Sequence, residues 1–148
     1  MIKNQTSYQK IEDHMKSLIA SMDKDQAISY AISSISDILK TFNLTLFDER
    51  LNIALDKAKA YHSYKTYRVS DIRKEALICH QIARSSSDLK DVHLARLIGQ
   101  GISTIHVKTH ALGILYYLDK LLHDMHVSNE DIDQYFMNQL SILNTYSK

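Results

Sequence analysis

The chain has 148 residues, of which 45% are hydrophobic and 24% charged, a balance typical of globular proteins and not of disordered ones. Its formal net charge is +1 at pH 7, which excludes a general electrostatic attraction to nucleic acid or to an anionic membrane. This length predicts a single domain over residues 1–148. Cys79 is the only cysteine, so no internal disulfide can form, as is typical of a reducing compartment.

The sequence predicts a cytoplasmic location. Residues 1–7 are polar and lack the apolar segment of a signal peptide. The longest apolar run, Ala111–Leu118, has eight residues. A membrane-spanning helix needs roughly 20, so we expect no contact with a membrane interior.

Apolar residues recur at spacings of three and four, and proline is absent. This pattern predicts an all-α fold, a compact bundle of about six to seven helices. The first helix carries apolar residues from Tyr8 to Met22, and Asp23–Asp25 supplies the start of a second, whose apolar stripe runs over 28–42.

Polar residues predict the starts of the next helices. Thr45 with Asp48 resembles a capping box and would open a third helix that extends to Tyr61. Ser70 would cap a fourth helix, and the polar run 85–88 would separate it from the next. Ser128 with Asp131 would begin the last helix.

Residues 88–124 predict a central apolar helix or helix pair. One unbroken helix of this length would span roughly 55 Å, whereas a compact domain of this size has a diameter of about 40 Å. We therefore expect a break at 103–108, where Ser103 and Thr104 could cap a new helix.

All three glycines, Gly99, Gly101 and Gly113, fall within fifteen residues of this central segment. Glycine weakens a helix by roughly 1 kcal/mol relative to alanine. Glycines so placed indicate that another backbone or a ligand comes close.

If the segment is one helix, its small and polar residues lie within about 40° of one line; a break divides this line between two helices. Small residues and polar groups that find hydrogen-bond partners suggest a structural role, while a cleft, a ligand pocket or a partner interface are alternatives. The residues of this seam are Gly99, Ser103, His106, His110, Gly113 and Tyr117, flanked by Arg96 and Gln100.

Two histidines of the seam, His106 and His110, have a spacing that could bind zinc on one helix face. No glutamate follows His106 and no third ligand has a recognisable spacing, so we predict no metal and no cofactor. A metal-dependent enzyme built on this pair and a small-molecule-binding protein remain alternative hypotheses. Cys79 and His80 are adjacent and point about 100° apart on a helix, which favours a buried, inert thiol.

Two further segments are rich in charge. Residues 61–68 interleave tyrosines with basic groups, which would suit single-stranded nucleic acid but is more typical of helix packing or a protein contact. Residues 119–133 carry five acidic groups and one lysine, which predicts a solvated face that could steer a basic partner. We predict no nucleic-acid partner.

The central segment also resembles a family of small helical bacterial proteins described as immunity proteins of polymorphic toxin systems. The matching residues are Arg96, Gly99, Gln100, Ser103, Thr104, His106, Val107, Thr109, His110, Ala111, Gly113 and Tyr117. A weaker similarity lies upstream, in Ala76, His80, Ala83 and Arg84. The chain departs from the pattern at Gly101 and Ile102, where alanine or another small residue is expected.

The resemblance implies a compact α-helical bundle that neutralises a cognate toxin by binding it, without enzymatic activity. Its signature residues in this chain are Arg96, Gly99, Gln100, His106, His110, Gly113 and Tyr117. The resemblance implies a protein partner but gives neither the contact surface nor the oligomeric state.

Overall fold

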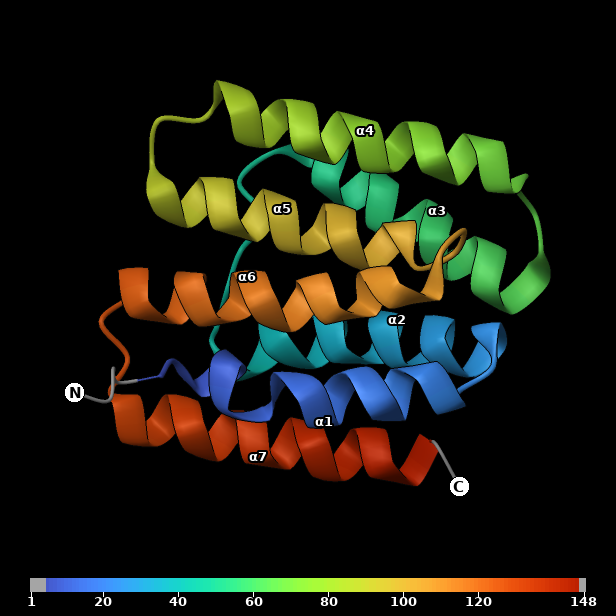
Figure 1. Cartoon of the computed structure of the whole chain (residues 1–148). Coiled ribbons are helices and arrows are strands. Elements are labelled where there is room, and N and C mark those ends of the chain that lie inside the picture. Colours follow the sequence, from blue (N-terminus) through green and yellow to red (C-terminus); the bar gives the residue numbers. More distant parts are fainter. Residues whose placement is uncertain (1–4, 147–148) are drawn as a thin grey trace.

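The computed structural model describes residues 5–146, which form seven α-helices and one 3-10 turn (Figure 1). The predicted all-α bundle is therefore confirmed. The elements are α1 (Ser7–Ser21), α2 (Lys24–Thr41), α3 (Glu49–Tyr64), α4 (Val69–Ser85), α5 (Leu89–Ser103), η1 (Lys108–His110), α6 (Ala111–Asp124) and α7 (Asn129–Tyr146).

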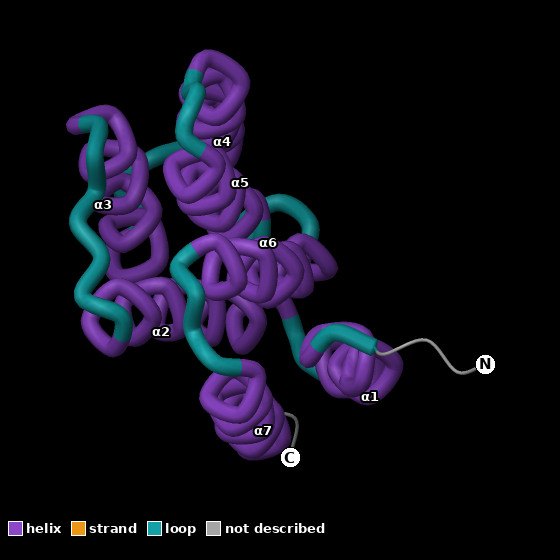
Figure 2. Tube along the Cα trace, turned by 90° about the vertical axis from the view of Figure 1, so that its left-hand side faces the viewer, coloured by secondary structure: helices purple, strands orange, loops and turns teal. Residues whose placement is uncertain are grey.

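The central feature of the bundle is a row formed by α4, α5 and α6, in which α5 and α6 are antiparallel (Figure 1). Helices α2 and α3 pack on one side of this row, and α1 and α7 lie next to α6 (Figure 2). Helix α5 contacts α2, α3, α4 and α6, as its nearly all-round apolar character predicts. The predicted central helix pair at 88–124 is thus confirmed.

Three of the predicted helix starts are confirmed by their hydrogen bonds. The Asp23 carboxylate accepts the Gln26 N–H at 2.8 Å, and the Gln26 side chain accepts the Asp23 N–H in return. Asp88 accepts the Lys90 N–H at 2.9 Å to begin α5. Ser128 accepts the Asp131 N–H at 3.2 Å beside the start of α7.

Two other predicted starts are wrong by a few residues. Helix α3 begins after Asp48, whose carboxylate accepts the Arg50 N–H at 2.9 Å, so Thr45 caps nothing. Helix α4 begins after Arg68, and Ser70 lies inside its first turn. The reason is Asp71, whose carboxylate accepts the Arg68 N–H at 3.1 Å and so fixes an earlier start.

The break between α5 and α6 lies where the length argument places it, but its cause differs from the prediction. The Ser103 hydroxyl donates to the Gly99 carbonyl and the Thr104 hydroxyl to the Gln100 carbonyl, so both residues end α5 instead of capping the next helix. Lys108 then donates to the carbonyls of Ala20 and Met22, which ties the connector to the end of α1.

Three helices end at a residue in the left-handed conformation. Asn43, Lys65 and His126 have φ angles of 52°, 54° and 60°, and they follow α2, α3 and α6. Each glycine, by contrast, has a negative φ and lies within a helix. Within residues 5–146, no helix combines the length and the apolar character that crossing a membrane requires.

Candidate functional site

Gly99 provides the space for a histidine of the neighbouring helix. A Cβ atom at Gly99 would lie 3.0 Å from two atoms of the His80 ring on α4 and 3.2 Å from the Cβ of Cys79. Arg96, one turn earlier on α5, lies with its Nη1 2.9 Å from Nδ1 of His80. Because a guanidinium can only donate, His80 accepts at Nδ1 and is neutral in this arrangement.

Gly113 provides the space for Gln100. A Cβ atom at Gly113 would lie 2.5–2.7 Å from Oε1, Cγ and Cβ of Gln100. The same Oε1 lies 2.9 Å from Nδ1 of His110, which donates to it. The chain reversal therefore brings the two halves of the signature face to face, so that a glycine of α6 allows a side chain of α5 to reach the connector.

Gly101 lies on the opposite side of α5 and serves the core. A Cβ atom at Gly101 would lie 2.3 Å from Cδ1 of Ile35 on α2 and 3.3 Å from Cδ1 of Ile114. Both isoleucines are fully buried. A close approach thus explains each of the three glycines, but the approaching group is a side chain in every case and not the backbone or ligand that was predicted.

His106 and His110 are half-buried, and their ring centroids lie 5.5 Å apart. Nδ1 of His106 is buried and has no hydrogen-bond partner among the described residues, so the structural role, in which polar groups of the seam find such partners, does not account for this atom. Residues 5–146 contain no group of three or more side chains placed to hold a metal ion. The structure therefore adds no third ligand to this pair.

The polar groups of the signature form an environment that disfavours protonated histidine. Burial lowers the pKa of His80, and the charge of Arg96, followed by those of Arg84 and His110, lowers it further. Burial also lowers the pKa of His106 and of His110. The cluster therefore favours neutral imidazoles, of which His80 and His110 hydrogen-bond to side chains of α5.

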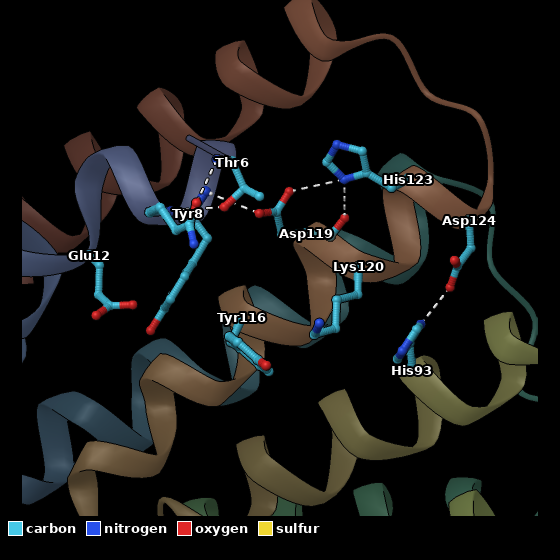
Figure 3. A pocket seen from close by; sticks show the side chains of 10 residues that line it. Thr6, Tyr8, Glu12, His93, Tyr116, Asp119, Lys120, His123 and Asp124 are labelled. Carbon is cyan, nitrogen blue, oxygen red and sulfur yellow. Dashed lines mark hydrogen bonds and ion pairs between the residues drawn. The ribbon is translucent and has the colours of Figure 1, made fainter. Parts of the chain in front are cut away.

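Tyr117 makes its ring contacts outside this cluster. Its ring contacts His93, at 6.3 Å between centroids, and Tyr116, at 5.0 Å. A pocket of about 450 Å³ lies near this end of α6, but Tyr117 does not line it. The pocket is lined by Thr6, Tyr8, Gln9, Glu12, His93, Tyr116, Asp119, Lys120, His123 and Asp124 (Figure 3).

Asp119, in this pocket, does not belong to the solvated face that was predicted for the acidic segment 119–133. It is 4% exposed, and its carboxylate accepts the N–H of Tyr8 in the first turn of α1 at 3.2 Å. Nδ1 of His123 lies 3.2 Å from the other carboxylate oxygen (Figure 3). Asp133 likewise accepts from Ser7. The acidic segment therefore anchors α1, because carboxylates stabilise a helix N-terminus.

Cys79 and two tyrosines of the segment 61–68 have structural roles, whereas a third tyrosine of that segment is exposed. Cys79 is fully buried, and burial raises the pKa of its thiol to about 12, which fits the predicted inert role. Tyr61 and Tyr67 pack against the core, each beneath a lysine, whereas Tyr64 is 80% exposed.

One set of residues was not predicted as a site. Arg73, Leu77, His80 and Arg84 recur on α4 at spacings of four, three and four, which places them on one helix face. The signal was present in the sequence, but the apolar stripe of α4 was the stronger pattern. The Arg96–His80 bond joins this face to α5.

The comparisons with known proteins identify the family. A family model described as "Imm-5 like putative immunity protein" matches residues 17–145. The chain belongs to this family. The match runs from the second half of α1 almost to the end of α7, so it covers the residues of the signature and those of the arginine-bearing face of α4. Comparison with curated proteins and comparison with solved structures give no match.

Proposed function

We propose that this Imm-5 like protein is a non-enzymatic immunity protein that neutralises a cognate toxin by direct protein contact in the cytoplasm. The observation that carries the proposal is the family match over residues 17–145. The arrangement of the signature supports it, because Arg96 bonds to His80 and Gln100 bonds to His110, so that one pair joins α5 to α4 and the other joins α5 to η1. Groups committed to such mutual bonds suit a rigid binding scaffold.

We further propose that the signature residues Arg96, Gly99, Gln100, His110 and Gly113 act by shaping this scaffold. Their contacts are internal to the bundle: two glycines admit two side chains, and those side chains hydrogen-bond to two partners. Partly buried polar groups of this kind help to specify a single fold when their hydrogen bonds are satisfied. Recognition of the partner would then fall to exposed residues nearby.

The proposal is tested by co-expression with the toxin encoded by the neighbouring gene. We expect the tagged immunity protein to capture the toxin from the lysate and to restore growth of the host cells. An unrelated helical protein of similar size, expressed at the same level, is the control for non-specific protection. Absence of both a complex and protection would contradict the proposed function.

A further inference from the structure

One face of α4 carries exposed residues that contribute nothing to the core. Arg73, Leu77 and Arg84 are exposed, Leu77 to 60%, and His80 is half-buried beside them. Glu75 lies roughly on the opposite side of α4, where it pairs with Lys57 of α3 at 2.7 Å. In Figure 2, α3 lies to one side of α4, and no described helix covers the opposite side of α4.

The charged groups that gather at this face are cationic. Arg96 reaches it from α5 and bonds to His80 at 2.9 Å. Arg84 lies close enough to His80 to act on it electrostatically, and Arg73 and Lys24 act in the same way on His106. Like charges brought together on one surface create a local positive potential even where the whole chain is almost neutral.

The arginines of this face form no ion pair with a carboxylate of residues 5–146. In the part of the chain that the structure describes, neither Arg73, Arg84 nor Arg96 lies within ion-pair distance of a carboxylate. Five other surface cations do have a carboxylate partner, in the pairs Lys10–Asp133, Lys16–Glu12, Arg50–Asp48, Lys57–Glu75 and Lys65–Asp25. Isolated lysines such as Lys59 and Lys90 have none among the described residues, so what distinguishes this face is that several unpaired cations lie together on it. Arg96 is committed to His80, but Arg73 and Arg84 are exposed and free to pair with carboxylates on the surface of another molecule.

We infer that the cationic face, defined as Arg73, Leu77 and Arg84 with Arg96 and His80 beside them, is the surface that binds the toxin. The toxin would present an acidic surface to the arginines and an apolar side chain to Leu77. This inference rests on the proposed function and adds to it the contact surface and the chemistry of the partner.

Leu77 favours an acidic protein over a nucleic acid as the occupant. An exposed leucine flanked by arginines matches the composition of a protein interface, in which apolar contacts and arginine carry much of the binding energy. Nucleic-acid binding depends mainly on phosphate contacts and would gain little from an aliphatic side chain at the centre of the face.

The test measures how tightly three proteins bind the purified toxin that the neighbouring gene encodes. They are the wild type, Arg73→Glu/Arg84→Glu, and the control Lys59→Glu/Lys90→Glu, which makes the same change in net charge at exposed lysines elsewhere. We expect the first double variant to weaken binding at least 30-fold and the control less than 3-fold. The wild-type affinity should also fall as salt is raised.

Each outcome separates the inference from the proposed function. Equal binding by the wild type and the Arg73→Glu/Arg84→Glu variant, or equal weakening in both double variants, overturns the inference but leaves immunity intact. Failure of the wild type to bind the toxin overturns both. A 20-nucleotide single-stranded DNA is the comparison ligand. If the wild type binds it more tightly than the toxin, and the arginine variant does not, the inference that the face binds a protein is overturned. Equal melting temperatures of the three proteins exclude unfolding as the cause.

Discussion

At the scale of single residues, each glycine corresponds to one side chain that needs its space: His80 for Gly99, Ile35 for Gly101 and Gln100 for Gly113. The sequence allowed us to predict the close approaches, because glycine within a helix is costly without one. It did not allow us to predict the partners. His80 and Ile35 lie far from their glycines along the chain, and only tertiary packing brings each pair together.

The pair Gly101 and Ile35 offers a direct test of this complementarity. We expect Gly101→Ala to destabilise the fold by about 1–3 kcal/mol, because the new Cβ would overlap Cδ1 of Ile35. Ile35→Val removes that atom and alone should cost about 0.5–1.5 kcal/mol. The double variant should be more stable than the sum of the two effects by about 1 kcal/mol, measured by urea unfolding. Strict additivity would show that the two residues do not compete for one space.

At the scale of elements, the existence of the helices was predictable, because each one carries a local apolar stripe. Their first residues were less predictable wherever several polar side chains compete for the same N–H groups. Asp71 decides the start of α4 against Ser70, since its carboxylate accepts the Arg68 N–H. The hydrogen bonds of the signature residues could not be predicted from the sequence, because they join α4, α5 and η1 and depend on how these elements pack.

Asp23 and Ser70 give a matched pair of variants that separates a residue that caps a helix from one that lies inside its first turn. Asp23→Ala should destabilise the protein by about 1 kcal/mol, because the capping box at α2 is lost. Ser70→Ala should change stability by less than about 0.5 kcal/mol, because Ser70 lies inside the first turn of α4 and alanine is a good helix former. Thermal unfolding of both variants measures the difference. A larger loss in Ser70→Ala would show that α4 begins at Ser70 in solution.

The histidine cluster between α4, α5 and η1 makes stability depend on pH. Burial lowers the folded-state pKa of His80, His106 and His110, so the unfolded chain takes up protons more readily. The free energy of unfolding should therefore be unaffected well above about pH 6.5, the value for an unfolded histidine, and should fall below it until the folded pKa values are passed.

Urea midpoints at several pH values between neutral and mildly acidic solution measure this loss. His80→Gln/His110→Gln should show a shallower decrease than the wild type, because two of the three groups no longer titrate. His14→Gln, at an exposed histidine of α1, is the control for removal of an imidazole. The same decrease in the wild type and the double variant would contradict the role given to the cluster.

At the scale of the whole molecule, α5 contacts four other helices, and α1 is anchored to α6 and α7 through Asp119 and Asp133. We therefore keep the prediction of one domain over the whole chain. Thermal unfolding should be a single transition with the same midpoint by far-ultraviolet circular dichroism and by tyrosine fluorescence. Two separated midpoints would show that part of the bundle, most simply α1 with α7, unfolds independently.

The positions with positive φ have a consequence for engineering the stability of this protein. His126, which follows α6, adopts φ 60°, a conformation that glycine reaches without strain and histidine does not. His126→Gly should therefore raise the melting temperature by a few degrees, a gain of about 0.5–1 kcal/mol, as calorimetry would detect. The glycines of this chain lie within helices, where neighbouring side chains need the space, and its positive-φ positions are occupied by larger residues. A more heat-resistant variant therefore requires no substitution in the core.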